Sequence, residues 1–365
     1  MLNNKTIAVV VPAYNEEKQV IEVLDTMPDF VDRIVVVNDC SKDDTATFIS
    51  DYIKQKRSTW PGVRIERSKP RATRYNRAEV VLYEMKEADL NRYLPSEVVN
   101  EHPETDRIIL INNLTNGGVG AAIARGYKWC LDHGIDCTAV MAGDGQMDPA
   151  ELESICKPVV EDQVDYAKGN RLIHRSAWLI MPRTRYIGNS ILSILTKIAS
   201  GYWHVSDTQT GYTAISLRAL EAVRIFDIYK RYGMPNDMLV RLNIAFCTLK
   251  EVEIKPVYEI GEQSKMKISK IISPIILLLF KSFFKRLWIK YLFRDFHPLF
   301  LLYHFSFILG IAMIPYMLKI IRIWLEGGNV PTITMIVFTL LFIGFFQSLL
   351  FAMWMDIQDN ERLYK

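Results

Sequence analysis

Two oxygen-bearing side chains stand two positions apart, directly after a short apolar run. The run Cys137–Met141 is followed by Ala142-Gly-Asp144-Gly-Gln146. Carboxylate and amide oxygens suit hard divalent cations, and Mg²⁺ in particular keeps coordination positions for the phosphates of a substrate. We therefore predict that Asp144 and Gln146 bind Mg²⁺ or Mn²⁺ next to a diphosphate.

Three more polar loops follow apolar runs. Residues 11–16 have the sequence Val-Pro-Ala-Tyr-Asn-Glu, a second loop begins at Asp39, and residues 116–122 have the sequence Asn-Gly-Gly-Val-Gly-Ala-Ala. The Asp39 carboxylate can accept a hydrogen bond from a nucleobase N–H or a ribose hydroxyl. In the third loop, glycines permit close backbone approach, and a helix N-terminus there favours a phosphate or a nearby carboxylate. Ile123 replaces the third glycine of a dinucleotide fingerprint, which disfavours an NAD-dependent enzyme.

These loops are placed by an alternation of short β-branched runs with helical stretches, which is typical of a parallel sheet covered on both faces. In such sheets, ligands bind at the carboxyl ends of the strands. The sequence therefore predicts an α/β fold with the four loops at one edge. We expect strands at Ile7–Val11, Arg33–Asn38, Ile108–Ile111 and Cys137–Met141, and helices at Glu16–Met27, Asp44–Lys56, Gly118–His133 and Pro149–Asp162.

A polar, charge-dense stretch at about residues 55–107 interrupts this alternation and is interpreted as an insertion. Residues 78–91 within it suit one amphipathic helix, whose apolar face would hold Val80, Val81, Tyr83 and Leu90. Both a solvated decoration and a contact with a partner stay open for this helix.

The C-terminal hundred residues are far more apolar than the rest. No charged residue occurs in 299–318 or in 327–355. A bilayer core of about 30 Å needs about 20 apolar residues in a helix, so both runs are long enough to span it. We predict a two-helix transmembrane hairpin with a short tail over residues 296–365, in the cell membrane.

Residues 266–295, just before the hairpin, interleave cations with aromatic side chains, which suits amphipathic juxtamembrane helices on an anionic headgroup surface. Lys and Arg are more numerous before the first span than in the loop between the spans, which predicts that residues 1–265 and the C-terminus are cytoplasmic. The cations in question are Lys281, Lys285, Arg286, Lys290 and Arg294.

The overall composition excludes several classes. The 365 residues are 50% hydrophobic and 23% charged, which rules out a disordered or collagen-like chain. A net charge of +3 gives no argument for nucleic acid as a partner. The five cysteines form no CxxC pair or zinc spacing, which fits a reduced, cytosol-facing domain.

The four loops together resemble family-2 glycosyltransferases of the GT-A fold, in the polyprenyl-phosphate branch that includes dolichyl-phosphate mannose synthase and undecaprenyl-phosphate glucosyltransferases. The resemblance implies a GT-A domain, Rossmann-like with a mostly parallel sheet, over residues 1–265. It also implies that Asp144 and Gln146 match the metal-binding end of the family's Asp-x-Asp motif, whose first Asp is Ala142 here. The nucleotide pocket would be lined by Pro12, Tyr14, Glu16, Asp39, Gly118 and Asp144.

The same resemblance covers an acceptor side. Arg171 and Arg185 match arginines that grip a lipid phosphate, and the Gly-x-x-Ser-Lys-like loop that contains Ser264 and Lys265 matches one that borders the reacting centre. The family's arginine before that loop is absent, so Lys265 and Lys267 are expected to supply its charge. Two further residues are assigned to the catalytic set: Asp207, as an orienting group, and Asp237, where Asn236-Asp237 replaces an acidic pair.

The implied reaction moves one sugar from a nucleotide sugar, a UDP-hexose, to a polyprenyl phosphate on the cytoplasmic leaflet. A phosphate monoester with a second pKa of about 6 is mostly dianionic at pH 7, so it needs positioning rather than a general base. In-line attack would invert the anomeric carbon.

Two other functions stay open, as does a homo-oligomer. A processive polysaccharide synthase typically has a Gln-x-x-Arg-Trp motif, which this sequence lacks, and two helices are too few to enclose a polymer channel unless subunits combine. A catalytically silent membrane subunit that binds a nucleotide sugar is suggested by Ala142.

Overall fold

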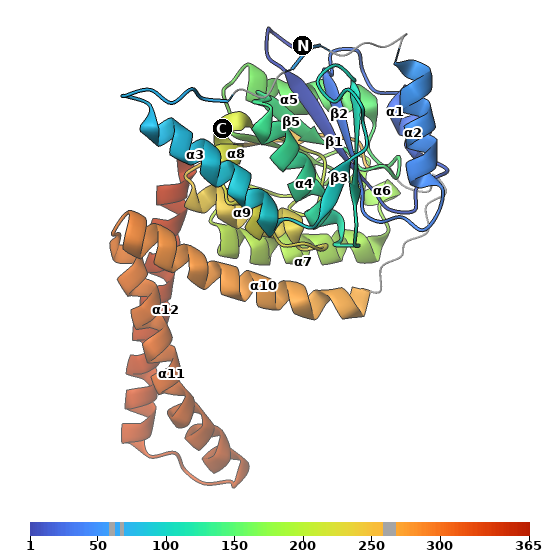
Figure 1. Cartoon of the computed structure of the whole chain (residues 1–365). Coiled ribbons are helices and arrows are strands. Elements are labelled where there is room, and N and C mark those ends of the chain that lie inside the picture. Colours follow the sequence, from blue (N-terminus) through green and yellow to red (C-terminus); the bar gives the residue numbers. More distant parts are fainter. Residues whose placement is uncertain (58–62, 66–68, 258–267) are drawn as a thin grey trace.

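A computed structural model describes residues 1–57, 63–65, 69–257 and 268–365 (Figure 1). An eight-stranded sheet in the order β3-β4-β2-β1-β5-β7-β6-β8 forms its centre. The neighbouring strands β4, β2, β1 and β5 are parallel, whereas β3 and β7 are antiparallel to their neighbours. The strands are β1 (Ile7–Ala13), β2 (Arg33–Asn38), β3 (Ser96–Val98), β4 (Ile108–Asn113), β5 (Cys137–Val140), β6 (Tyr166–Asn170), β7 (Thr213–Ser216) and β8 (Leu249–Glu253).

The predicted mixed α/β fold is confirmed, because helices cover both faces of this sheet. Alternate residues of β1 point to opposite faces: Val10 packs with α4, α8 and α9, whereas Val9 packs with α1, α2 and α5. A Cβ at Gly126 of α4 would lie 2.4 Å from Val10 Cγ1, so this glycine lets helix and strand approach closely. The helices are α1 (Val20–Asp25), α2 (Thr45–Lys56), α3 (Arg77–Ala88), α4 (Val119–Asp132), α5 (Leu152–Val160), α6 (Ala177–Ile180), α7 (Arg183–Ser200), α8 (Leu217–Ala222) and α9 (Met234–Ile244).

The interrupting stretch 55–107 contains the predicted helix, as α3, and also an edge strand that the sequence did not indicate. β3 pairs antiparallel with β4, so part of the stretch belongs to the sheet. No residue of α3 is buried, and Val81 of its expected apolar face is 43% exposed. The helix therefore lies on the surface, where Lys86 contacts Glu221 of α8 at 2.9 Å.

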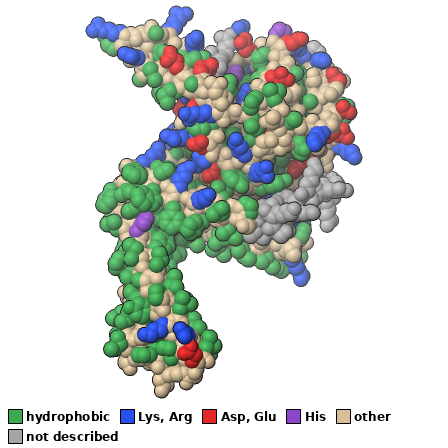
Figure 2. Space-filling view, turned by 60° about the horizontal axis from the view of Figure 1, so that its bottom comes forward, with side chains coloured by type: hydrophobic (Ala, Val, Ile, Leu, Met, Phe, Trp, Pro, Cys, Tyr) green, Lys and Arg blue, Asp and Glu red, His purple; other side chains and the backbone are tan. Residues whose placement is uncertain are grey.

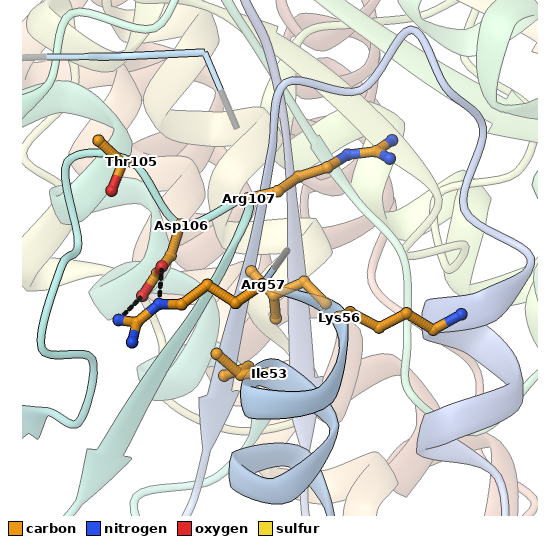
Figure 3. Close-up of a pocket in the computed structure, with 7 residues that line it drawn as sticks. Ile53, Lys56, Arg57, Thr105, Asp106 and Arg107 are labelled. Carbon is orange, nitrogen blue, oxygen red and sulfur yellow. Dashed lines mark hydrogen bonds and ion pairs between the residues drawn. The ribbon is translucent and has the colours of Figure 1, made fainter. Parts of the chain in front are cut away.

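The two ends of this stretch are joined by an ion pair. Arg57 Nε and Nη2 lie 3.0 and 3.2 Å from the two carboxylate oxygens of Asp106 (Figure 3). Lys56 points away from this pair in the same view. The cavity beside it measures about 20 Å³, room for about one water molecule. This charged cluster is thus a structural clamp rather than a ligand site.

The C-terminal part begins with one long helix, α10 (Ile268–Trp288), continued by the short π-helical segment η4 (Ile289–Arg294). α10 packs along α7 and α9 (Figure 1). The expectation that its cations face lipid phosphates is wrong for two of them, because Arg286 and Lys290 are completely buried. Their partners lie in the protein, so these two residues attach the helix instead of contacting a membrane surface.

Arg286 forms the centre of a buried polar network. Its Nη1 and Nη2 donate to the two oxygens of Asp356, at 2.6 and 2.7 Å, and its Nε donates to the carbonyl of Ala199 in α7. Lys290 donates to Asn243 of α9 and to Asn360. The network therefore joins three parts that are distant in sequence: the sheet domain, α10 with η4, and the end of the last helix.

The two predicted spans are present as α11 (Pro298–Leu325) and α12 (Thr332–Glu361), each long and apolar enough to cross a membrane. They pack on each other and project away from the sheet domain (Figure 1). Most of their apolar surface is uncovered, and Figure 2 shows hydrophobic side chains over the hairpin with charged ones at its tip. Beyond α12, the backbone at Tyr364 bridges to Leu249 of β8, so the chain returns to the sheet edge.

We expect Arg286→Met to lower the free energy of unfolding by about 3–5 kcal/mol, because it leaves the buried Asp356 carboxylate without a counter-charge. Thermal unfolding in detergent measures the change. The double variant Arg286→Met, Asp356→Leu should regain much of the loss, since it buries no unpaired charge. Arg322→Ala, which breaks an exposed pair with Glu326, is the control and should unfold like the wild type. Equal stability of all four proteins would contradict the anchoring role.

Candidate active site

A cavity of about 440 Å³ opens at the carboxyl edge of the parallel strands. It receives residues from the loops after β1, β2 and β5 and from the start of α4. All six residues predicted to line a nucleotide pocket lie around it: Pro12, Tyr14, Glu16, Asp39, Gly118 and Asp144. The structure thus brings together residues that are up to 132 positions apart, counted from Pro12 to Asp144.

The loops after β1 and β2 hold each other. Asn15 N donates to Ser41 Oγ, Asn15 Oδ1 accepts from Lys42 N, and Glu16 N donates to Thr45 Oγ1. Asn15 therefore links two loops, and the next helix begins only at Val20. At the start of α2, the Asp43 carboxylate accepts from Thr45 N, whereas the N-cap residue Asp44 forms no side-chain capping hydrogen bond. This mutual bracing fixes the wall that carries Tyr14 and Glu16.

Asp39 is buried, and its carboxylate accepts a set of hydrogen bonds from the loop before α4. Gly118 N donates to Oδ2 at 2.6 Å, Gly117 N donates to Oδ1 at 3.0 Å, and Asn113 Nδ2 donates to Oδ1 at 2.9 Å. Asp39 lines the cavity as predicted, but much of its accepting capacity holds the glycine loop. The nearby carboxylate anticipated at this helix N-terminus is Asp39.

The next amides of α4 are also engaged. Gly120 N and Ala121 N donate to the carbonyl oxygen of Lys230, at 2.9 and 3.3 Å. A Cβ on Gly118, whose φ is +88°, would lie 2.7 Å from that oxygen, so only glycine fits there. The phosphate expected at this helix N-terminus thus finds four amides, those of Gly117, Gly118, Gly120 and Ala121, occupied by protein acceptors.

Asp144 lies at a tight turn in which Gly145 has a φ of +72°. Its Oδ1 accepts a hydrogen bond from Gln146 N at 3.1 Å, and its side chain lines the cavity, whereas Gln146 does not. Among the described residues, no three His, Cys, Asp or Glu side chains are placed to share a metal ion. The donor set fits a Mg²⁺ or Mn²⁺ ion held by one carboxylate together with substrate phosphates, a mode that Mg²⁺ commonly uses.

Arg171 and Asp207 form one two-point ion pair away from the residues that line this cavity. Arg171 Nε and Nη2 lie 2.8 and 3.2 Å from the carboxylate oxygens. Burial would raise the pKa of Asp207, but the charges of Arg171 and Lys168 outweigh it and hold that pKa below its ordinary value. Burial lowers the pKa of the neighbouring Lys168 to about 8. Asp207 thus holds the guanidinium of Arg171 in a fixed orientation.

The remaining candidates lie apart. Arg185 is in the first turn of α7 and half-buried. Asp237 in α9 is buried, and its Oδ2 accepts from Tyr229 N and Arg241 Nε. It lines neither this cavity nor the adjoining one, so its observed contacts hold the loop before α9. The predicted acceptor residues Ser264, Lys265 and Lys267 lie outside the described residues.

The sequence reasoning missed the loop between η3 (Ile225–Asp227) and α9. Its residues Arg231 and Tyr232 also line the cavity, and Arg231 lies beside Gly118. Tyr232 and Val119 also border a second cavity of about 190 Å³, which reaches Gln209 and Pro235. No spacing rule marks Arg231, because it reaches the cavity through the fold and not through a strand-end motif.

Comparison with known proteins agrees with this architecture. The model for "Glycosyl transferase family 2" matches residues 8–78 and 94–224, which is more than half of the chain. The chain belongs to glycosyltransferase family 2. The unmatched residues 79–93 contain most of α3, so the stretch that departs from the family is shorter than the predicted 55–107.

Two curated relatives of this glycosyltransferase confirm the resemblance to the polyprenyl-phosphate branch. UDP-N-acetylglucosamine–dolichyl-phosphate N-acetylglucosaminyltransferase of Methanococcus voltae is 26% identical over 79% of this chain and 97% of its own length. Undecaprenyl-phosphate mannosyltransferase of Micrococcus luteus is 28% identical over 45% of this chain and 66% of its own.

A solved structure, glucosyl-3-phosphoglycerate synthase of Mycobacterium tuberculosis with Mn²⁺, UDP and phosphoglyceric acid, aligns over 78% of both chains. The sequence identity is 15% and the TM-score is 0.46.

We expect Asp39→Ala to destabilise this glycosyltransferase by about 1–3 kcal/mol, because the amides of Gly117 and Gly118 lose their acceptor. It should also weaken nucleotide binding, since Gly118 forms part of the cavity wall. Thermal unfolding and titration with UDP measure the two effects. Asp44→Ala removes an exposed carboxylate from the same loop and should change neither. If Asp39→Ala unfolds at the wild-type temperature, Asp39 does not hold the glycine loop.

Proposed function

We propose that this protein is a membrane-anchored, inverting glycosyltransferase that moves one sugar from a nucleotide sugar, a UDP-hexose, to a polyprenyl phosphate at the cytoplasmic leaflet. Two features that belong together in one folded body support the proposal. A cavity lined by all six nucleotide candidates belongs to the same body as an apolar helical surface and two helices able to span a membrane.

The donor side rests on the 440 Å³ cavity, which suits a nucleoside diphosphate in size and depth. Asp144 would hold Mg²⁺ or Mn²⁺, which neutralises charge on a leaving diphosphate when bound. With Ala142 in place of a second carboxylate, the protein contributes fewer negative charges here. The relative from Methanococcus voltae is named for a UDP-sugar donor, which favours UDP.

The acceptor side rests on Arg171. Asp207 accepts hydrogen bonds from its Nε and Nη2, which fixes the plane of the guanidinium. A planar guanidinium donates to phosphate oxygens through two parallel hydrogen bonds. We infer that Arg171, with Arg185, binds the lipid phosphate, and that no general base is needed because this phosphate is already ionised.

The lipid chain requires an apolar surface next to that phosphate site. α6 and the start of α7 follow Arg171 in sequence and expose apolar side chains, with Leu179 83% exposed. α10, which packs against α7, exposes Phe280 to 62% (Figure 1). Such helices fit the boundary between headgroups and acyl chains. The exposed apolar residues of α6 and α7 are Trp178, Leu179, Ile180, Ile187, Ile191, Ile194 and Leu195.

Transfer of radiolabel from UDP- and GDP-sugars to a short-chain polyprenyl phosphate tests this function. With Mg²⁺ or Mn²⁺, one donor should label the lipid, and EDTA should abolish labelling. Asp144→Ala should lower kcat by at least about a hundredfold, because it removes electrostatic stabilisation of the departing charge. Arg171→Ala should mainly raise KM for the lipid and leave UDP affinity unchanged.

Arg92→Ala, which removes an exposed arginine that lines neither cavity, is the control and should retain full activity. A product carrying several sugars would favour a processive synthase instead. If no donor labels the lipid while UDP still binds, a silent nucleotide-sugar-binding subunit replaces the proposal.

The proposed topology places the turn between α11 and α12 outside the cell. A membrane-impermeant maleimide should label Asn329→Cys on intact cells, because Asn329 is exposed in that turn. Asp295→Cys, exposed between η4 and α11, should be labelled only after permeabilisation. The unmodified chain controls for its five free cysteines, four of which are buried. The reverse labelling pattern would overturn the cytoplasmic location of the catalytic domain.

A further inference from the structure

We propose that Arg231 binds the diphosphate of the donor nucleotide and supplies the positive charge that the glycine loop does not. The inference rests on the proposed function in one respect, namely that the 440 Å³ cavity takes a nucleotide. It adds a residue that no strand-end motif indicated.

The charged side chains around the cavity support this role of Arg231. The cavity is lined by three carboxylates, Glu16, Asp39 and Asp144, and by one arginine, Arg231. A nucleoside diphosphate brings further negative charge into this space. Asp39 is compensated by the amides of the glycine loop, but the other carboxylates face the same volume as the ligand. A fixed cation in the lining therefore favours an anionic group such as a diphosphate in the part of the cavity next to Arg231.

The N-terminus of α4 has protein acceptors on several of its amides. Free amides at the start of a helix commonly bind phosphate. Here Asp39 accepts from Gly117 and Gly118, and the Lys230 carbonyl accepts from Gly120 and Ala121. The residue after Lys230 is Arg231, so the segment that occupies the amides also brings a guanidinium to the cavity.

The position of the Arg231 side chain supports the same role. The Arg231 side chain runs along Gly118, because a Cβ on that glycine would lie 3.4 Å from Arg231 Cγ. Arg231 has no hydrogen-bond or ion-pair partner within the described parts of the chain. Its guanidinium is thus available for phosphate oxygens, with which arginine forms two parallel hydrogen bonds.

Two contacts hold the loop that carries Arg231. On one side, Asp237 accepts a hydrogen bond from Tyr229 N at 2.9 Å. On the other side, Gly233 packs against α10 so closely that a Cβ would lie 2.7 Å from Leu278 Cδ2. Arg231 is therefore positioned by the catalytic domain and by the helix that leads to the membrane hairpin.

The test is calorimetric titration of the full-length protein in detergent with UDP, GDP and UMP, each with Mg²⁺ and with EDTA. For the diphosphate that the wild type binds, Arg231→Gln should weaken affinity by about tenfold to a hundredfold, with and without metal. Binding of UMP, which lacks the second phosphate, should fall much less. Arg231→Lys should recover part of the loss, because it keeps the charge without the fork.

Arg224→Gln is the matched control, because Arg224 is exposed and lines neither cavity. It should bind UDP like the wild type. Wild-type affinity in Arg231→Gln would overturn this proposal and leave the proposed function intact. Nucleotide binding that depends on Arg231, without sugar transfer to the lipid, would overturn the proposed acceptor alone. If the wild type binds neither diphosphate, both proposals are wrong.

Discussion

The buried ion pair between Arg286 and Asp356 is the interaction on which the arrangement of the molecule depends. Both side chains are fully buried, and an isolated charge in such a place costs several kcal/mol, so the two groups must stay together. Arg286 also donates to carbonyls of α7, which ties the pair to the sheet domain. After α12 the chain returns to β8 through Tyr364. The C-terminal end of α12 therefore packs as part of the catalytic domain and is not a flexible attachment. This attachment fixes how far the cavity lies from the apolar helices.

A second constraint is that buried backbone amides need acceptors, and it decides how charge is distributed in the site. Four amides at the start of α4, those of Gly117, Gly118, Gly120 and Ala121, are taken by the Asp39 carboxylate and by the Lys230 carbonyl. These amides are consequently not available to a phosphate. Under the proposed function, side chains must therefore provide most of the recognition of a diphosphate. Ala142 stands where the family has a carboxylate, so fewer protein groups would hold a metal ion, and the positive charge of Arg231 becomes more important.

The sequence allowed the parallel strands and the group of loops around the cavity to be predicted because both follow from local signals. Residues 34–37 of β2 are apolar and β-branched throughout, and parallel strands bring the loops that follow them to one edge. What could not be predicted depends on contacts between distant segments. Arg286 and Lys290 look like surface cations in sequence, because nothing local indicates Asp356 or Asn360 as their partners. Arg231 and the edge strand β3 were missed for the same reason: each is placed by elements more than ten positions away.

Transfer to a phosphate requires two anions to approach each other, and the protein must make that approach favourable without a base. Flexible cations would lose conformational entropy each time they gather around the substrates. In this structure Arg171 is already ordered, because the buried Asp207 carboxylate accepts from two of its side-chain nitrogens. The backbone at Asp207 is held in turn, since the Glu251 carboxylate accepts from Ser206 N and Asp207 N. Glu251 orients Asp207 and Asp207 orients Arg171, so the charge that meets the lipid phosphate under the proposed function is fixed in advance. Such preorganisation would be the main source of rate enhancement for a nucleophile that needs no deprotonation.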